Sequence, residues 1–272
     1  MQIPFWKMHG ALNDFILVDD RELTFPAHNQ QWLAKIMQRR TGIGAEGILL
    51  IQPSGTADFR MRFFNPDGGE VDMCGNGARC IARLAHEIGV APASLSMETG
   101  AGIVRAEVQT DQVRLRMTEP KDWRLNGTLM IDGEQVTYHY VVCGVPHVMI
   151  PVRNLTTFDV DRIGELIRYD KAFQPNGTNA NFVKVTGPNS LIVRTYERGV
   201  ESETLACGTG ITACGLLAGK LGLVTTPIKV RPLSGDVLEV NYTSTADSAT
   251  DVTLCGPATH VFRGDLEYPE KV

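Results

Sequence analysis

The alternation of apolar and polar residues along the chain predicts a protein made mainly of short strands. Residues 59–64, FRMRFF, alternate apolar side chains with arginine, and residues 48–51 form the continuous apolar run of a buried strand. Further strands are expected at residues 15–18, 94–98, 102–109, 113–117, 135–143, 148–152, 180–185 and 191–196, with short helices at 31–40 and 163–168. Residues 144–147, GVPH, are expected to connect two of these strands. The pattern therefore indicates a mixed α+β chain dominated by sheet.

Two stretches about half a chain apart repeat one pattern. They are VDMCGNGARCIARLAHEIGV, residues 71–90, and LACGTGITACGLLAGKLGL, residues 205–223. Each has a cysteine, a Gly-x-Gly turn and apolar residues at helical spacing, and each closes with a glycine suited to a helix C-cap. The repeat predicts two equivalent helices in two duplicated halves.

Cys74 and Cys207 come directly before these two expected helices. The unpaired N–H groups and the positive dipole end of a helix N-terminus stabilise anions, both a thiolate and a carboxylate bound beside it. Two such thiols indicate paired acid and base chemistry. The alternative is that both are ordinary buried cysteines, as most free cysteines are. The other four cysteines lack this setting: Cys80, Cys143, Cys214 and Cys255.

Composition narrows the class of protein. A chain of 272 residues with 43% hydrophobic content suits two domains, and a net charge of -5 gives no basic footprint for nucleic acid. No apolar run is long enough to span a bilayer, and the N-terminus lacks the features of a signal peptide. Six scattered cysteines without a CxxC pair fit reduced thiols rather than disulfides or structural zinc. A cytoplasmic protein without a metal is therefore expected.

Moving a proton at a carbon next to a carboxylate needs a base on one face and an acid on the other. Two cysteines would supply both, provided one is thiolate and the other thiol. His147 and Glu197 are candidates for the proton acceptor or the positive field that promotes the thiolate. Taken alone, a histidine after proline is more often a turn or core residue, and Glu197 with Arg198 is equally a surface ion pair.

Polar side chains near the thiols are candidate substrate contacts. The amides of Asn13, Asn65, Asn76 and Asn179 offer donors and acceptors for ammonium and carboxylate groups. Arg198 is able to hold a carboxylate through two parallel hydrogen bonds. Each residue alone is a weak signal because asparagine-rich turns are common; their placement beside the thiols makes them candidates.

Six motifs together resemble the diaminopimelate epimerase family: KMHGALNDF, FFNPDGGEVDMCGNGARC, GVPH, GTNANFV, YERGVESETLACGTG and GPATHVFRG. The resemblance covers nearly the whole chain. It implies interconversion of LL- and meso-diaminopimelate, for lysine and cell-wall synthesis, without pyridoxal phosphate or metal. It also implies that Cys74 and Cys207 are the acid/base pair, with His147 and Glu197 as partners. The implied substrate contacts are Asn13, Asn65, Gly75, Asn76, Asn179, Glu197, Arg198, Gly208 and Thr209.

The resemblance implies a fold as well. Two pseudo-symmetric domains are expected, each a β-barrel-like wrap of strands around a central helix, with the last strands returning to the first domain. The expected boundaries are 1–118 plus 257–272 for the N-terminal half and 119–256 for the C-terminal half. Homodimers are usual in the family, so a homodimer is expected here.

Three departures from the family pattern leave other functions open, and one of them is a segment between Glu197 and Cys207 that is one residue longer than in many members. Gly47 stands where many members have glutamine, and Val145 stands where many have asparagine. One alternative is therefore a racemase of another amino acid on the same scaffold. The other is a non-catalytic protein whose helix N-termini bind a small anion. Exchange of a substrate α-proton with solvent deuterium separates the anion-binding protein from the two enzymes.

Overall fold

The chain forms two compact units. The computed structural model describes residues 1–268. Unit 1 comprises Met1–Leu115 together with the C-terminal segment from Gly256, and unit 2 comprises Arg116–Cys255. The boundaries expected from the sequence lie at residues 118 and 256, a few residues away. Within the described residues, no helix combines the length and apolar character needed to cross a membrane.

Unit 1 is a sheet wrapped around one helix. Its strands are β1 (Gln2–Gly10), β2 (Asn13–Asp19), β3 (Ile48–Gln52), β4 (Phe59–Phe64), β5 (Glu70–Val71), β6 (Ser94–Thr99), β7 (Gly102–Gln109), β8 (Gln112–Arg116) and β18 (Thr259–Glu267), and its helices are α1 (Gln30–Met37) and α2 (Gly75–Glu87). The strands pair in the order β18-β1-β2-β3-β4-β6-β7-β8. Only β2–β3 and β4–β6 are parallel, and their crossovers carry α1 and α2 respectively.

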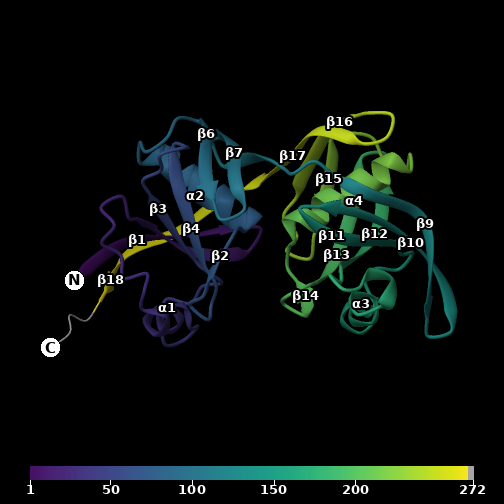
Figure 1. Ribbon diagram of the computed structural model, residues 1–272, viewed down its shortest axis with the longest axis horizontal. Helices are drawn as coiled ribbons and strands as arrows, with labels where there is room; N and C mark the ends of the chain where they lie inside the picture. Colours follow the sequence, from purple (N-terminus) through teal and green to yellow (C-terminus); the bar gives the residue numbers. More distant parts are fainter. Residues whose placement is uncertain (269–272) are drawn as a thin grey trace. The chain divides into compact units, whose positions relative to one another are not determined.

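Helix α2 is the centre of unit 1. It contacts β1, β2, β3, β4 and β7, and Figure 1 shows it among these strands. Most of its surface is buried, and small side chains such as Ala78, Ala82 and Ala85 allow the strands to approach closely. The helix is followed by Gly89 at φ +74°, in the left-handed conformation expected after a helix C-terminus.

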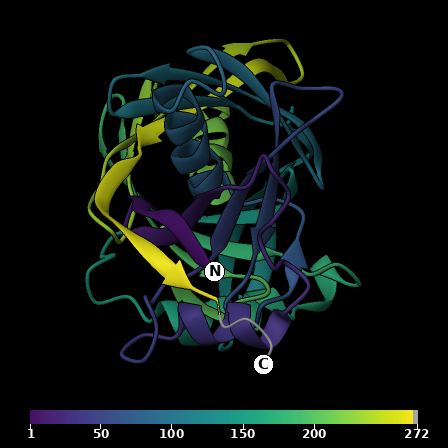
Figure 2. The same cartoon turned by 90° about the vertical axis from the view of Figure 1, so that its left-hand side faces the viewer.

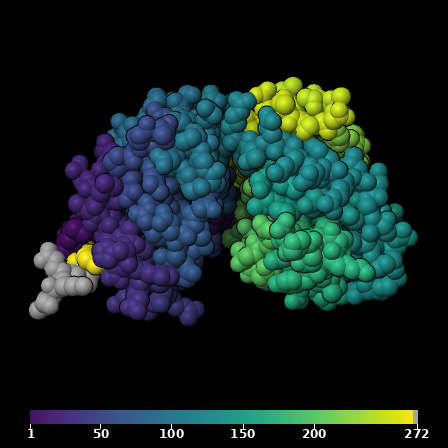
Figure 3. All heavy atoms as spheres, in the orientation of Figure 1, coloured from purple at the N-terminus to yellow at the C-terminus, as the bar shows by residue number. Residues whose placement is uncertain are grey.

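The last strand of the chain completes the sheet of unit 1. β18 pairs antiparallel with β1 from Gln2 opposite Glu267 to His9 opposite Thr259. Figure 2 shows this strand, in yellow, running beside the purple N-terminal strand. In the space-filling view of Figure 3, yellow atoms lie against purple ones at the same place. The first and the last described strands are therefore neighbours in one sheet.

Unit 2 repeats the plan of unit 1. Its strands are β9 (Lys121–Ile131), β10 (Glu134–Cys143), β11 (Val145–Pro151), β12 (Asn179–Gly187), β13 (Ser190–Glu197), β14 (Ser202–Thr204), β15 (Ile228–Arg231), β16 (Leu238–Ser244) and β17 (Ala249–Pro257), and its helices are α3 (Val160–Arg168) and α4 (Gly208–Lys220). The order is β9-β10-β11-β12-β13-β15-β16-β17, with β11–β12 and β13–β15 parallel and the other pairs antiparallel. This sequence of parallel and antiparallel pairs is identical to that of unit 1.

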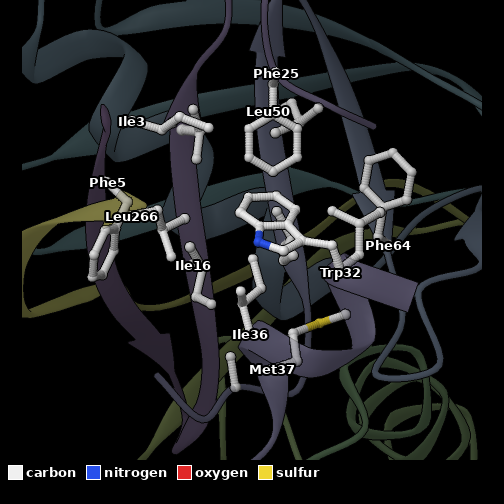
Figure 4. Close-up of a cluster of buried hydrophobic side chains, with 14 residues drawn as sticks. Ile3, Phe5, Ile16, Phe25, Trp32, Ile36, Met37, Leu50, Phe64 and Leu266 are labelled. Carbon is white, nitrogen blue, oxygen red and sulfur yellow. The ribbon is translucent and has the colours of Figure 1, made fainter. Parts of the chain in front are cut away.

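Each unit has a second apolar layer under its outer helix. In unit 1 the indole of Trp32, from α1, lies in the middle of this layer (Figure 4). Its ring centroid is 5.7 Å from that of Phe25 and 4.9 Å from that of Tyr268. In unit 2 the corresponding layer places Ile167 of α3 in one cluster with Phe182 of β12. Each sheet is therefore buried on both faces in its central part.

The structure corrects several element boundaries. The first helix ends at Met37 rather than near Arg40, and Val145–His147 belong to β11 instead of a loop. Gly144, at φ +73°, is enough to join β10 to β11, so the GVPH motif needs no longer connection. The hydrophobic pattern gave no bounds for the four strands described after residue 227, and the resemblance implied only that the last strands return to the first domain.

Candidate active site

Each of the two candidate cysteines occupies the N-cap position of a central helix. Cys74 has extended backbone angles, φ −140° and ψ 122°, immediately before α2. Cys207 has φ −110° and ψ 107° immediately before α4. Both carbonyls accept the first helical hydrogen bonds, from Ala78 and Ile211 respectively. Each thiol therefore lies beside the positive end of a helix dipole, as the sequence predicted.

Three of the other cysteines have the surroundings of ordinary core residues. Cys80, Cys143 and Cys214 are buried. Burial raises the pKa of Cys80 and of Cys143 to about 12 and raises that of Cys214 well above its usual value. These thiols remain protonated near neutral pH, and a thiol is a poor nucleophile or base.

In unit 1 the first turn of α2 is joined to the start of β2 by side-chain hydrogen bonds. Asn13 Oδ1 accepts from Cys74 Sγ at 3.8 Å and from Asn76 Nδ2 at 3.1 Å. Asn76 Oδ1 accepts in turn from Arg79 Nη2 at 2.9 Å. The structure thus brings three of the predicted residues, Asn13, Cys74 and Asn76, into one hydrogen-bonded group.

The two ends of this group fix the orientation of both amides. Arginine only donates, so the Asn76 atom facing Arg79 is oxygen. At the other end Asn13 Nδ2 donates to the carboxylate of Glu46, which only accepts. The atom of Asn13 that faces Cys74 is therefore its oxygen. Arg79 is fully buried, and it also donates to the carbonyls of Gly75 and Pro257.

A charged cluster supports the Asn13 end of unit 1. Asp14 forms ion pairs with Lys7 at 2.5 Å and with Arg39 at 2.7 Å. Burial opposes ionisation of Asp14, but hydrogen bonds from Arg39 and Lys7 lower the pKa of its carboxyl. Arg39 also contacts Glu46 at 3.5 Å. This network holds the β2 start, and hence Asn13, in place.

Two further positions named from the sequence, Asn65 and Gly47, lie just outside strands of unit 1. Asn65 follows β4 and closes a turn, because its backbone N–H donates to the Gly69 carbonyl and its own carbonyl accepts from Gly68 N–H. Gly47 precedes β3 and packs against aromatic rings. A Cβ added there would lie 2.3 Å from Phe63 Cε2 and 3.2 Å from Phe15 Cδ1. A longer side chain at Gly47 would therefore require these rings to move.

In unit 2 the ends of three strands hold the predicted polar residues. Asn179 Oδ1 accepts from the backbone N–H of Arg198 at 2.9 Å, and its Nδ2 donates to the Pro146 carbonyl at 3.0 Å. Arg198 Nη1 donates to the Asn176 carbonyl at 2.8 Å. Glu197 accepts from Thr204 Oγ1 at 2.8 Å. Asn179 thus joins β11 to the Arg198 end of β13.

The start of α4 carries the remaining predicted residues. Cys207 is buried, and its Sγ lies 3.5 Å from Thr209 Oγ1, with either atom able to donate. Gly208 opens the helix. The thiol, the hydroxyl and the N–H groups of the first turn therefore form a compact set of donors that suits a carboxylate.

His147 lies inside unit 2 with no exposed surface. Its Nδ1 is 3.3 Å from Asn181 Nδ2, which also donates to the Val148 carbonyl at 2.8 Å. Thr195 Oγ1 donates to Asn181 Oδ1 at 2.9 Å. Burial, with a smaller contribution from Arg198, lowers the pKa of His147 to about 3, so the imidazole is neutral.

Arg79, Asn181 and Thr195 belong to these networks but were not expected from the sequence. One signal for Asn181 was available, because it follows Asn179 by two residues and strand alternation places both on one face. Arg79 lies one turn beyond Gly75 on α2, but its burial could not be read from the sequence. Across the described part of the chain, no group of three or more His, Cys, Asp or Glu side chains is arranged to hold a metal ion.

Comparison with protein families gives one match over most of the chain. The family described as "Diaminopimelate epimerase" matches residues 5–123 and 139–261. The diaminopimelate epimerase of Chlorobaculum tepidum is 43% identical over 95% of this chain and 99% of that protein. Those of Aquifex aeolicus and Archaeoglobus fulgidus are 39% and 40% identical, over 97% and 99% of this chain and 98% of each relative.

Solved structures with much lower identity share the fold. A Bacillus anthracis phenazine biosynthesis protein of the PhzF family aligns with a TM-score of 0.74 at 18% identity, covering 98% of this chain and all of that one. A hydroxyproline epimerase from Agrobacterium vitis aligns with a TM-score of 0.71 at 17% identity, covering 97% of this chain and 91% of that one. The expected fold, two units each wrapped around a central helix, is therefore confirmed.

Proposed function

The chain belongs to the diaminopimelate epimerase family, and from that membership we propose that it interconverts LL- and meso-diaminopimelate through Cys74 and Cys207. The observation that carries the proposal is the pair of cysteines at the N-cap positions of equivalent helices, in a chain aligned over nearly its full length with named diaminopimelate epimerases. No organic cofactor is needed in this scheme, because the two side chains supply both the base and the acid.

The reaction moves one proton off a carbon and places another on its opposite face. One cysteine, as thiolate, takes the α-proton and becomes a thiol, and the electron pair left on carbon is delocalised into the neighbouring carboxylate. The other cysteine, as thiol, gives its proton to the opposite face and becomes the thiolate. The configuration is inverted, and the two roles exchange for the reverse reaction.

The helix starts stabilise the charge that builds on the carboxylate. The N–H groups in the first turns of the two helices, at Gly75 and Asn76 of α2 and at Gly208 and Thr209 of α4, are preorganised donors near the thiols. Such donors cost no reorganisation at the moment of reaction, so they lower the barrier rather than only tightening binding.

The remaining predicted residues are assigned by their chemistry. Glu197 and His147 support the thiol chemistry, and Asn13 accepts from Cys74. Asn65, Asn179 and Arg198 contact the second amino-carboxylate end of the substrate, which simple amino acids lack. Arg198 is suited to a carboxylate because its guanidinium presents parallel donors.

Further aspects are proposed on family membership. The enzyme acts in lysine and peptidoglycan precursor synthesis in the cytoplasm, as a homodimer. Its two catalytic halves are residues 1–118 with 257–272, and residues 119–256. Size-exclusion chromatography with light scattering measures the oligomeric state directly, and a monomer at working concentration contradicts the dimer.

Replacement of either cysteine tests the two-base assignment. Cys74→Ala and Cys207→Ala should each lower the rate of inversion by at least about 100-fold, because general acid or base catalysis contributes on that order. Cys80→Ala and Cys214→Ala are matched controls on the same two helices and should retain turnover. Inversion is measured by chiral chromatography in deuterated solvent. Near-normal inversion in either Cys74→Ala or Cys207→Ala contradicts the scheme.

Replacement of Arg198 tests the substrate. Loss of a charge-assisted hydrogen bond should lower kcat/KM for diaminopimelate by at least about tenfold in Arg198→Ala. Arg198→Lys keeps the positive charge but lacks the planar guanidinium, so its kcat/KM for diaminopimelate should lie between those of wild type and Arg198→Ala. A panel of amino acids is assayed in parallel. If the protein racemises a monocarboxylic amino acid faster than diaminopimelate, the substrate assignment is wrong.

A further inference from the structure

A buried polar group in unit 2 is not accounted for by the family assignment alone. His147, Asn181 and Thr195 are 0%, 0% and 4% exposed and are linked by hydrogen bonds. His147 Nε2 is itself buried and has no hydrogen-bond partner among the described residues. Burying polar groups costs free energy unless each is paired, so an orphaned nitrogen at the end of a paired network indicates a missing acceptor or donor.

The hydrogen-bond partners of Asn181 determine whether Nε2 of His147 is a donor or an acceptor. A backbone carbonyl only accepts, so the Asn181 atom 2.8 Å from the Val148 carbonyl is its nitrogen. The oxygen on the other side of the amide accepts from Thr195 Oγ1 at 2.9 Å. The second N–H of the amide is therefore directed at His147 Nδ1, 3.3 Å away. Nδ1 is the acceptor, and the single proton of the neutral imidazole is on Nε2.

Unit 1 is built from the same strands without this network. In unit 1 one row of opposite residues across β2, β3 and β4 is Ile16, Ile48 and Phe64. The equivalent row across β11, β12 and β13 of unit 2 is Val148, Ala180 and Tyr196. The residue before each of these is then equivalent by register in the two units: Phe15 corresponds to His147, Leu49 to Asn181 and Phe63 to Thr195. Unit 1 has apolar side chains at all three positions, and Phe15 and Phe63 meet edge to face at 6.0 Å. The fold does not need polar residues here.

The network lies directly under the start of α4. A Cβ added at Gly210 would lie 2.5 Å from Asn181 Oδ1 and 3.3 Å from Cys207 Sγ. The amide and the thiol are therefore close neighbours across the Gly210 backbone. In unit 1 the equivalent Gly77 has Leu49 Cδ1 at 3.1 Å instead. The polar network is thus present beside one thiol and absent beside the other.

We propose that Asn181, oriented by Thr195, is a positioning residue that holds His147 with its proton on Nε2, so that His147 is a hydrogen-bond donor to an anionic atom of the reacting site. This inference rests on the proposed epimerase function for its kinetic consequences. It assigns His147 the role of a fixed donor instead of a proton acceptor. The arrangement also gives the two halves unequal surroundings, although their chemistry is symmetric.

The tautomer is measured without any assay of turnover. In protein labelled with ¹⁵N-histidine, the ring nitrogens of His147 are identified by their loss in His147→Gln. The wild-type ring should show a proton on Nε2 and none on Nδ1 near neutral pH. In Asn181→Leu, which introduces the residue found at the equivalent Leu49, this preference should be lost or reduced. A wild-type ring protonated on Nδ1, or on both nitrogens, overturns the proposal.

Kinetics of a matched pair at Thr195 separate positioning from packing. Thr195→Val keeps the side-chain shape but removes the hydroxyl that orients Asn181, whereas Thr195→Ser keeps the hydroxyl. We expect Thr195→Val and Asn181→Leu to lower kcat by about tenfold or more with a much smaller change in KM. Thr195→Ser should recover most of the turnover. Equal losses in Thr195→Val and Thr195→Ser, or unchanged kcat in Asn181→Leu, overturn the proposal.

Failure of the proposed function is distinguishable from failure of this inference. If wild type does not epimerise diaminopimelate, the substrate assignment fails, and the ring ¹⁵N spectra still decide the tautomer. If wild type epimerises diaminopimelate but Asn181→Leu leaves the tautomer of His147 unchanged, the function stands and the positioning role is wrong. Thermal unfolding of each folded variant accompanies the kinetics.

Discussion

At the scale of single residues, burial decides the chemistry more than residue type does. His147 would carry partial charge near neutral pH if exposed, whereas complete burial lowers its pKa to about 3 and leaves it a neutral donor and acceptor. Asn13 and Asn181 are both ordinary amides, yet each has its orientation fixed by partners that only donate or only accept. The partners of each amide therefore determine which of its atoms faces the neighbouring side chains.

The pKa of His147 predicts a pH dependence of stability. The unfolded state binds a proton below about pH 6.5 and the folded state does not until about pH 3, so stability falls as the pH is lowered through this window. Between pH 7 and 5, His147→Gln should remove a slope approaching about 1.4 kcal/mol per pH unit. Urea unfolding measures the free energies, with the exposed His28→Gln as control. An unchanged slope in His147→Gln contradicts a neutral buried imidazole.

At the scale of elements, the same local arrangement occurs once in each unit, but the residues packed against it differ. A strand end, a cysteine N-cap and a buried helix recur in both units, and each helix is followed by a positive-φ glycine, Gly89 at +74° and Gly222 at +70°. The surfaces beneath the helix starts differ, because Leu49 faces Gly77 whereas Asn181 faces Gly210. Equivalent elements therefore carry unequal chemistry.

Alanine substitution at the two glycines should reveal this difference. At Gly210 the new methyl would meet Asn181 Oδ1 at 2.5 Å, and that oxygen is held by hydrogen bonds. Gly210→Ala should therefore lose roughly 1–3 kcal/mol of stability, in excess of any gain in helix propensity. At Gly77 the contact is the flexible end of Leu49 at 3.1 Å, so Gly77→Ala should cost less. Denaturant unfolding compares the two, and a larger loss at Gly77 contradicts the prediction.

At the scale of the whole molecule, the chain closes on itself within unit 1. β18 pairs with β1, which would otherwise be an edge strand of the sheet. Its Leu266 belongs to the same apolar cluster as Ile3, Phe5 and Trp32. The two units are therefore not two consecutive halves of the sequence. The position that β9 fills in unit 2 is filled in unit 1 by the last strand.

The dependence of unit 1 on its last strand is testable with two side chains of β18. Leu266 is 6% exposed, and Leu266→Ala should lower the free energy of unfolding by roughly 2–5 kcal/mol through loss of buried contacts. Val261 on the same strand is 54% exposed, and Val261→Ala should change stability by less than about 0.5 kcal/mol. Similar values for the two variants would show that the strand does not anchor this core.

The local features of this protein were determined by its sequence. Alternation located β4 and most of the other strands that it predicted to within a residue or two, and the repeated Cys-Gly-x-Gly pattern located α2 and α4 with their caps. These features depend on neighbours close in the chain, where periodicity and backbone conformation carry the information. The motifs also identified the family, because so many matched in order.

Only the tertiary structure decided which distant residues act together. It joined Arg79, Asn76, Asn13 and Glu46 into one oriented group, and it placed Asn181 and Thr195 around His147. These contacts depend on strand register and on burial, and a shift of one residue in register would move each side chain to the opposite face. The pKa of His147 has the same origin, because desolvation comes from elements far away in the sequence.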